Sequence, residues 1–523
     1  MPTIAISPPA AGAAPASRRR THSFAWKGAC AIGLVAIGDW LFANGHGGSI
    51  LGVYALLLLA ALLATRPATL RSRAALAAAG TAALFAFALG DDPSLLAAAL
   101  FWVAVTMAAL LPRTRFDTGL RWTIRLLCHL VLSVPQPLRD WGLIRSARHR
   151  LGALPWSRRL PILILPVLGS VVFVTLFASA NPLIEDALGG IEGASFFGGV
   201  SPLRLLLWAA LFLLVWSLLR PAIQQLAPAE GFNEDLRLPG VSLASVTLSL
   251  FAFNAIFALQ NGLDIAFLWS GAALPEAMTL AEYAHRGAYP LIATALLAGL
   301  FVLVTTRPGS DMAKSKLVRR LVTVWIAQNV LLVASTMLRT LDYVEVYSLT
   351  RLRIAALLWM ALVAIGLVLI CYRLWRERSG AWLINANMAA AALLLTGCAF
   401  ADLGAVAASW NVRHTRDAGG GGAALDLCFL NDLGASALLP LIELESRRLT
   451  PQMRDRIAWS RNAQMEVLEA RQADWRNWTF RGARRLAEAK ALVAERRLPR
   501  AKALPRNCDA VLPDPPLTAP RQG

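Results

Sequence analysis

Long apolar stretches recur along most of this chain, and short polar segments separate them. The windows 321–338 and 354–371, for example, contain no charged residue. A bilayer has a hydrocarbon core about 30 Å thick, which a helix crosses with roughly 20 apolar residues. Because backbone amides in lipid must hydrogen-bond within their own segment, we expect each window to form a helix. The pattern predicts an all-α fold, a polytopic transmembrane helical bundle.

The apolar windows give about eleven predicted spans. They cover residues 26–43, 48–65, 74–90, 95–111, 162–180, 203–219, 241–260, 288–305, 321–338, 354–372 and 381–401. Charged residues make up only 16% of the chain, whereas about a quarter is usual in soluble domains. The composition therefore argues against a water-soluble helical protein.

Basic residues between the spans gather on one side of the predicted bundle. The opposite side carries only Arg204, Arg286, Arg339, Arg351 and Arg353. Cytoplasmic loops hold the excess of Lys and Arg, so we expect a cytoplasmic N-terminus in a bacterial inner membrane, with the first span as a signal anchor. An odd number of spans then places the C-terminal domain in the periplasm, unless the last span is re-entrant. The net charge of +19 thus reflects topology, and we expect no nucleic-acid partner.

The distribution of spans and charges divides the chain into segments. We predict a disordered basic tail (1–25), four transmembrane helices (26–111), a basic cytoplasmic segment with an interfacial helix (112–161), a seven-helix core (162–401), a small helical C-terminal extramembrane domain (402–504) and a disordered tail (505–523). Within the C-terminal domain, residues 419–422 are all glycine, which predicts a flexible linker.

The predicted interfacial helix covers residues 119–134. Arg121, Arg125 and His129 follow one another at intervals of four residues and share one helix face. Such a basic face is expected to meet anionic lipid headgroups at the membrane surface. A solvated basic helix is the alternative.

Catalytic signatures are absent from the sequence. It contains no HExxH, GxSxG, Walker A or dinucleotide-binding pattern. The histidines lack metal-ligand spacing, and we expect neither a metal nor another cofactor. Cys428 and Cys508 both fall in the predicted periplasmic domain. Two free thiols are the favoured interpretation, and a disulfide, which that compartment permits, is the alternative.

Polar residues inside the spans are the main functional signal, because polar groups are costly in lipid and usually face the bundle interior. The intramembrane amides are Asn254, Gln260, Gln328, Asn329 and Asn385. We interpret them as interhelical hydrogen-bonding groups, with a transport pathway as the alternative.

Two polar loops form the second candidate site. They lie on the outer side of the predicted bundle, one between the seventh and eighth spans and one between the ninth and tenth. Their chemistry-bearing residues are Asp264, Tyr283, His285, Arg286, Arg339, Tyr343 and Arg353. One interpretation is a salt-bridge lattice over the helix ends. The other is a binding pocket in which the arginines hold an anionic group and His285 senses pH.

Three segments in this region, 281–299, 325–335 and 338–360, resemble the bacterial membrane proteins called domain of unknown function 4173, and the related 4153 group is similar. The resemblance covers roughly residues 160–375, and more loosely Asn411, Val412 and the stretch 425–441. Motif positions match at Tyr283, Arg286, Gly287, Gln328, Asn329, Arg339, Tyr343, Thr350 and Arg353. The resemblance implies a multi-spanning membrane protein without an assigned activity.

Three functions fit these observations to different degrees. The favoured one is a non-enzymatic envelope scaffold, sensor or partner protein that contacts the lipid bilayer and another membrane or envelope protein. The alternative is a transporter or channel for a small solute near the seventh, ninth and eleventh spans. An enzyme acting on lipid or polysaccharide is least favoured, because few acidic or histidine side chains converge at either membrane face.

Overall fold

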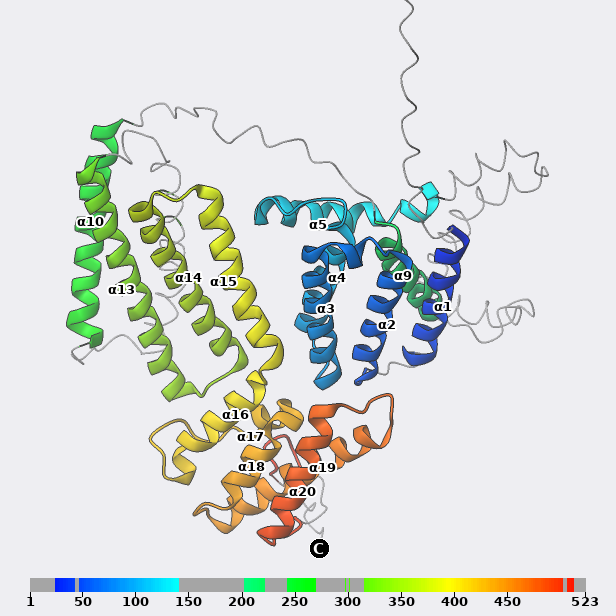
Figure 1. Cartoon of the computed structure of the whole chain (residues 1–523). Coiled ribbons are helices and arrows are strands. Elements are labelled where there is room, and N and C mark those ends of the chain that lie inside the picture. Colours follow the sequence, from blue (N-terminus) through cyan, green and yellow to red (C-terminus); the bar gives the residue numbers. More distant parts are fainter. Residues whose placement is uncertain are drawn as a thin grey trace, which may run out of the picture.

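Figure 1 shows the computed structural model, in which the described residues are 24–42, 47–140, 202–221, 242–269, 297, 301, 315–501 and 506–511. The regular elements among these residues are all helices. The predicted spans 162–180 and 288–305 lie outside the described residues, apart from residues 297 and 301. Most of the predicted tails 1–25 and 505–523 also lie outside them.

The N-terminal bundle consists of α1 (Phe24–Phe42), α2 (Ile50–Thr65), α3 (Arg73–Asp91), α4 (Leu95–Leu110) and α9 (Pro202–Leu219). The second bundle consists of α10 (Leu243–Asp264), α13 (Lys316–Tyr347), α14 (Arg351–Arg376) and α15 (Gly380–Phe400). A π-helical turn, η4 (Ile265–Trp269), extends α10, and a short 3-10 helix, η1 (Thr69–Arg71), joins α2 to α3. Helix α15 contacts α3 and α4 and so joins the two bundles.

A helix occupies each predicted span that lies within the described residues. Six of these helices, α1, α3, α10, α13, α14 and α15, are long and apolar enough to cross a membrane. Helices α2 and α4 and the part of α9 from Arg204 to Leu219 are apolar but shorter. The described residues therefore support a membrane protein with six candidate spans, and the expected eleven are not established.

Polar caps set where many helices begin. The side chains of Ser72, Ser94, Ser242, Ser315 and Ser379 each accept a hydrogen bond from a backbone N–H in the first turn of the helix that follows. A serine that precedes an apolar run supplies this acceptor without a bulky side chain. The apolar windows predicted the helices, and these residues locate their first turns.

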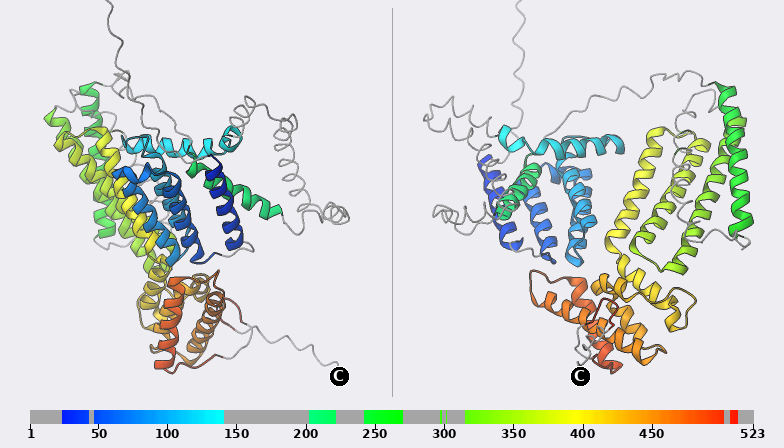
Figure 2. Two further views of the ribbon diagram at one scale, coloured as in Figure 1. Left: turned by 45° about the vertical axis from the view of Figure 1, so that its right-hand side comes forward. Right: turned by 180° about the vertical axis from the view of Figure 1, so that it is seen from behind.

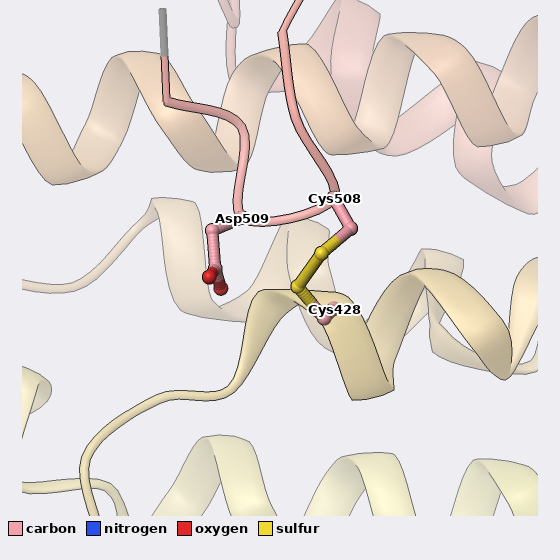
Figure 3. Close-up of side chains that lie close together, drawn as sticks. All are labelled: Cys428, Cys508 and Asp509. Carbon is pink, nitrogen blue, oxygen red and sulfur yellow. A yellow bond between two sulfur atoms is a disulfide. The ribbon is translucent and has the colours of Figure 1, made fainter. Parts of the chain in front are cut away.

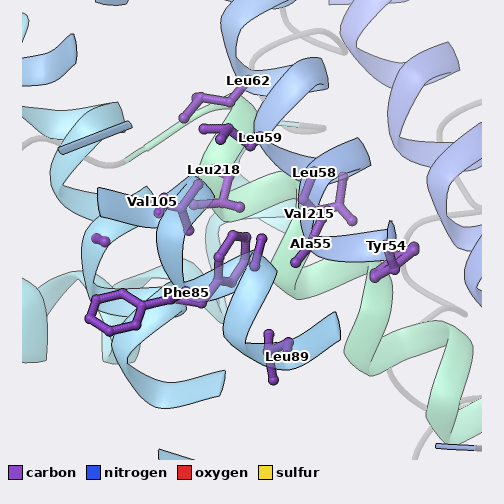
Figure 4. Packing of buried hydrophobic residues seen from close by; sticks show 14 of the residues in the cluster. Tyr54, Ala55, Leu58, Leu59, Leu62, Phe85, Leu89, Val105, Val215 and Leu218 are labelled. Carbon is purple, nitrogen blue, oxygen red and sulfur yellow. The ribbon is translucent and has the colours of Figure 1, made fainter. Parts of the chain in front are cut away.

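The core of the N-terminal bundle is built from apolar side chains of different helices (Figure 4). Leu58 and Leu62 from α2, Phe85 from α3, and Val105 from α4 are all buried in it. Gly52 allows α2 to approach α3 closely, because a Cβ atom at this position would lie 2.6 Å from the carbonyl oxygen of Ala86. Small residues at helix contacts permit such close packing in membranes.

Helix α5 (Gly119–Ser133) lies across one end of the N-terminal bundle and contacts α4, α9 and α15 (Figure 1). The basic face predicted to meet headgroups is engaged within the protein. Asp117 forms ion pairs with Arg121 at 3.1 Å and with Arg125 at 2.8 Å, and His129 is buried. The exposed side of the helix is apolar, with Leu120, Ile124, Leu127, Leu130 and Val131. The prediction did not consider Asp117, which lies two residues before the first residue of the helix.

The C-terminal domain is helical, and it lies at the end of the molecule opposite α5 (Figure 2). Its α-helices are α16 (Leu403–His414), α17 (Leu427–Asp432), α18 (Leu438–Glu445), α19 (Pro451–Ala473) and α20 (Phe480–Glu495), with the 3-10 helices η5 (Arg416–Ala418) and η6 (Gly434–Ala437) between them. The glycine run is an ordered turn and not a flexible linker. The amides of Gly420 and Gly422 donate to Thr415 O at 2.9 Å and to His414 O at 2.8 Å.

A disulfide joins Cys428 on α17 to Cys508 in the last described segment (Figure 3). It closes a separation of 80 residues. Asp509 lies beside the bridge, and its carboxylate and the two sulfur atoms lie within 4.8 Å of one another. The oxidised pair offers no thiolate ligand, and metal sites need the thiolate form, so this group is a structural bridge as it stands.

Arg481 of α20 attaches the C-terminal domain to the ends of α3 and α15, since it also donates to Phe400 O at 2.9 Å, whereas Arg485 pairs within the domain. Arg481 pairs with Asp91 at 2.7 Å and Asp92 at 3.0 Å, and Arg485 pairs with Asp402 at 2.5 Å. Backbone contacts add to this attachment. The amides of Gly48 and Ser49 donate to Arg476 O at 2.9 Å and to Trp478 O at 2.7 Å. The ring centroids of Trp40 and Trp475 lie 5.2 Å apart.

Burial and polar contacts act in opposite directions on the Asp402 carboxyl, which caps α16. Burial raises its pKa, but the hydrogen bond from Ala405 N and the ionic contact with Arg485 outweigh burial and leave the pKa below its usual range. Ser436 Oγ also donates to this carboxylate at 3.0 Å. The attachment of α20 therefore favours the ionised form of Asp402.

Candidate functional site

Most of the predicted intramembrane amides lie along the contact between α10 and α13. These helices run in the same direction, since Asn254 is near Leu321 and Asp264 is near Arg339. Gln328 Nε2 donates to Asn254 Oδ1 at 2.8 Å, and Asn254 Nδ2 donates to Leu321 O at 3.1 Å. The amides thus bond across the helix interface, as interhelical polar groups in membranes do.

Asn261 makes a further hydrogen bond across this contact, and Asn329 and Gln260 bond within their own helices beside it. Asn261 Nδ2 donates to the backbone oxygen of Gln328 at 3.2 Å, and the buried Asn329 donates to Trp325 O at 2.8 Å. Gln260 Nε2 donates to Asp264 Oδ1 at 3.0 Å. We call the set Asn254, Gln260, Asn261, Asp264, Gln328, Asn329 and Arg339 the polar seam.

The polar seam ends in an ion pair between Asp264 on α10 and Arg339 on α13. Their side chains are 1% and 6% exposed, so both charges are removed from solvent. Nearby, Trp269 Nε1 donates to Ser335 Oγ at 3.1 Å. A buried charge without its partner is strongly destabilising, and the pair therefore fixes the register of α10 against α13.

Several acceptor atoms of the polar seam are buried without a hydrogen-bond partner among the described residues. They are Asn261 Oδ1, Asp264 Oδ2, Gln328 Oε1 and Asn329 Oδ1. Buried acceptors are normally satisfied by protein or water. The seam therefore retains hydrogen-bonding capacity beyond the contacts that hold the two helices together.

The remaining predicted residues of the ninth-to-tenth loop are part of a helix end. Arg339 and Tyr343 lie within α13, which continues to Tyr347. The prediction placed them in a loop because the apolar window ends near residue 338, whereas the helix extends past it.

Arg353 and the tyrosines stabilise this helix end. Arg353 donates to Tyr347 O at 2.6 Å and also to Ser348 O. Its guanidinium lies 4.5 Å from the ring centroid of Tyr343, which stacks on Tyr347. Thr350 Oγ1 accepts from Arg353 N and caps α14. These motif residues thus terminate α13 and begin α14.

A cavity of about 180 Å³ opens beside this turn, between the end of α13 and α16. Its lining includes Glu345, Ser348, Trp410, Asn411, His414 and Gly422. The rings of Trp410 and His414 stack with centroids 3.9 Å apart. Asn411 fixes the turn, because it accepts from Leu349 N at 2.6 Å and donates to Leu349 O at 3.0 Å.

The structure separates one predicted residue from the others. Asn385 on α15 accepts a hydrogen bond from Gly119 N at the start of α5, at 2.8 Å. It does not join the polar seam. Tyr283, His285 and Arg286 lie outside the described residues. Asn261, Trp410 and His414 were not predicted as site residues, although Asn261 lies three residues from Asp264 on the same helix.

The chain matches a family model described as a domain of unknown function, DUF4153, over residues 29–444. It belongs to this family. The motif segments resembled the 4173 group first and the 4153 group second, and the model that matches is the second. The DUF4153 match begins in α1 and ends in α18, so it includes the N-terminal bundle, the polar seam and much of the C-terminal domain. Searches of curated proteins and of solved structures gave no match.

Proposed function

We propose that this DUF4153 protein is a non-enzymatic scaffold of a bacterial inner membrane. It crosses the bilayer about eleven times and presents its C-terminal domain to a partner protein in the periplasm. The observation that carries the proposal is the polar seam. Its ion pair and the hydrogen bonds of Asn254, Asn261 and Gln328 cross between α10 and α13, and this arrangement suits a rigid body more than a catalytic centre.

The attachment of the C-terminal domain supports the same proposal. Arg481 holds the domain against the ends of both bundles, through its ion pair with Asp91 and its hydrogen bond to Phe400 O. The cavity beside Trp410 and His414 lies on this attached domain and offers stacked aromatic rings next to the carboxylate-bearing Glu345. A partner that binds there would meet a fixed surface, which lowers the entropy lost on binding.

The disulfide supports a periplasmic C-terminal domain. Disulfides persist in oxidising compartments and are rare in the cytosol. The segments rich in Lys and Arg, such as 112–140, lie at the opposite end of the described molecule, together with α5. A reporter enzyme fused after Gly420 tests this orientation. Reporter activity on the cytoplasmic side would contradict it.

Site-specific photo-crosslinking tests the partner interaction in the full-length protein in cells. We expect a photoreactive residue at position 410 or 414 to give a crosslinked species of defined mass. The matched control is position 467 on α19, since Val467 is exposed on the same domain but away from the cavity. Equal crosslinking at all three positions, or none at 410 and 414, would contradict the proposal.

A small-solute transporter or channel is the second candidate, and the buried acceptors without partners in the polar seam favour it. Cysteine substitution at Asn261 and Asn329 distinguishes the two functions. A scaffold predicts that a membrane-impermeant thiol reagent leaves both cysteines unmodified. A transport path predicts modification of both. The exposed position 467 serves as the labelling control.

A further inference from the structure

A group of basic residues lies at the end of the N-terminal bundle opposite the C-terminal domain. Lys27 is in the first turn of α1, whereas Arg66, Arg113 and Arg220 follow the ends of α2, α4 and α9. The charges of these three arginines all act on the Lys27 ammonium. We call Lys27, Arg66, Arg113 and Arg220 the basic cluster.

The basic cluster is short of negative charge. Asp140 is the carboxylate that acts on Lys27. Both of its oxygens are already engaged, because Oδ1 pairs with Arg220 at 3.2 Å and Oδ2 accepts from Trp216 Nε1 at 3.0 Å. Among the described residues, this leaves Lys27, Arg66 and Arg113 with no acidic group of their own.

Arg66 is the most unusual member of the basic cluster. It is 6% exposed, and its Nη1 atom has no hydrogen-bond partner among the described residues. Burial and the nearby charge of Arg113 lower the pKa of Arg66 to about 10. In the same connection, Thr69 Oγ1 is also buried without a partner. A buried guanidinium normally pairs with a carboxylate or phosphate, whose geometry its donors match.

The position of the basic cluster indicates where an anion would come from. Phe24 and Trp26, adjacent to Lys27 in the first turn of α1, are both exposed. Aromatic side chains at the ends of spans lie at the depth of the lipid headgroups. A phosphate at this depth belongs to a phospholipid, and basic pockets between membrane helices bind such headgroups.

We propose that the basic cluster binds the phosphate of an anionic phospholipid, with Arg66 as its buried donor. Lys27 and Arg113 add charge at the rim, while Arg220 is held by Asp140. The acyl chains extend along the exposed apolar surface of α1. This site is independent of the scaffold function, because it lies at the other end of the molecule from the C-terminal domain.

Thermal unfolding of the purified full-length protein tests the proposal. In detergent with added phosphatidylglycerol, we expect a concentration-dependent rise in Tm. Phosphatidylcholine should give none. Inorganic phosphate or pyrophosphate without lipid should also give none. Stabilisation by these soluble anions alone would support phosphate recognition and overturn the lipid as its source.

Arg66→Gln tests the role of the buried donor. We expect about tenfold weaker phosphatidylglycerol binding from the loss of one charge-assisted hydrogen bond. Arg71→Gln is the matched control, since it removes the same charge from an exposed residue of the same connection. Its affinity should stay within about twofold of the parent protein. Equal lipid affinity in both variants would overturn the proposal.

A structural role for Arg66 makes a different prediction. Without anionic lipid, Arg66→Gln should be at least as stable as the parent protein, because it removes a buried charge that lacks a counter-ion. A lower Tm in phosphatidylcholine would show that Arg66 stabilises the fold directly, and would overturn the proposal. If Arg66→Gln fails to fold, Arg113→Gln at an exposed position tests the same site, and an unchanged affinity would overturn it.

Discussion

The buried charge of Asp264 is compensated by that of Arg339, and each charge would be strongly destabilising inside the bundle without the other. The sequence predicted both residues as members of a polar site, since charged side chains beside apolar windows stand out. The salt-bridge lattice expected over the helix ends contained both, but which carboxylate pairs with Arg339 stayed open, because Asp264 and Arg339 lie 75 residues apart in the sequence. Asn261 was missed for a related reason, since an amide at the end of a span has the pattern of a surface residue.

Replacing one member of this pair should be strongly destabilising. We expect Asp264→Asn to lower the free energy of unfolding by about 3–5 kcal/mol, because Arg339 would remain buried without its counter-ion. Chemical unfolding in detergent measures the change. The double variant Asp264→Leu with Arg339→Met should recover most of the loss, since it leaves no buried charge. A single variant as stable as the parent protein would show that the pair is not formed.

Asp402 should make stability depend on pH. Its folded-state pKa lies below the usual 3.8, so the folded protein binds this proton less tightly than the unfolded chain. The stabilisation is present above about pH 4 and is lost as the pH falls below it. We expect Tm to fall between pH 5 and pH 3 (on the order of one pKa unit on each side of that value).

Asp402→Asn is the variant that isolates this contribution. The fall in Tm should be smaller than in the parent protein. Burial raises the pKa of Asp92, so this carboxyl contributes to the pH dependence of stability with the opposite sign. Asp92→Asn should therefore retain the fall in Tm between pH 5 and pH 3 (about one pKa unit on each side of the usual value). An identical profile in Asp402→Asn and the parent protein would contradict the assignment.

At the scale of helices, apolar windows locate the spans but not the helix ends. Helix α13 has 32 residues, and at 1.5 Å per residue it extends about 48 Å, well beyond a hydrocarbon core of about 30 Å. Arg339 and Tyr343 belong to the part outside the apolar window. Helix α5 shows the same limit, since its helical period was predicted but its pairing with Asp117 was not. Caps and ion pairs depend on neighbours that hydropathy does not register.

The end of α13 should depend on Arg353. We expect Arg353→Ala to lower the free energy of unfolding by about 1–3 kcal/mol, because the carbonyls of Tyr347 and Ser348 lose a charged donor. Leu352→Ala is the matched control at a highly exposed position, and its effect should stay within about 0.5 kcal/mol. Equal losses in the two variants would show that the guanidinium contacts do not stabilise this turn.

At the scale of the whole molecule, ion pairs attach the C-terminal domain to the end of α3, and a hydrogen bond from Arg481 attaches it to the end of α15. The sequence predicted a helical domain near residues 402–504, and the structure has helices from Leu403 to Glu495. Its position against α1, α2 and α3 was not predictable, because the contacting residues lie hundreds of positions apart. Arg481 had no distinguishing pattern among the many arginines of this region.

Arg481 should control this attachment. We expect Arg481→Ala to increase cleavage of the C-terminal domain in limited proteolysis several-fold, because Asp91 and Asp92 lose their shared partner. Lys490→Ala is the matched control, since Lys490 pairs with Glu469 at an exposed site where such pairs contribute about 0–1 kcal/mol. If both variants resist protease like the parent protein, the backbone contacts alone hold the domain.

The contact between residues 47–49 and residues 476–480 can form only late in the synthesis of the chain. Gly47 N donates to Asn477 Oδ1 across a separation of 430 residues. At about 5–20 residues per second, a ribosome needs roughly 20–90 s to synthesise that length. The first helical hairpin therefore enters the membrane long before its partner exists. Arg481 follows Asp91 by 390 residues, so this ion pair also forms only when translation has reached α20.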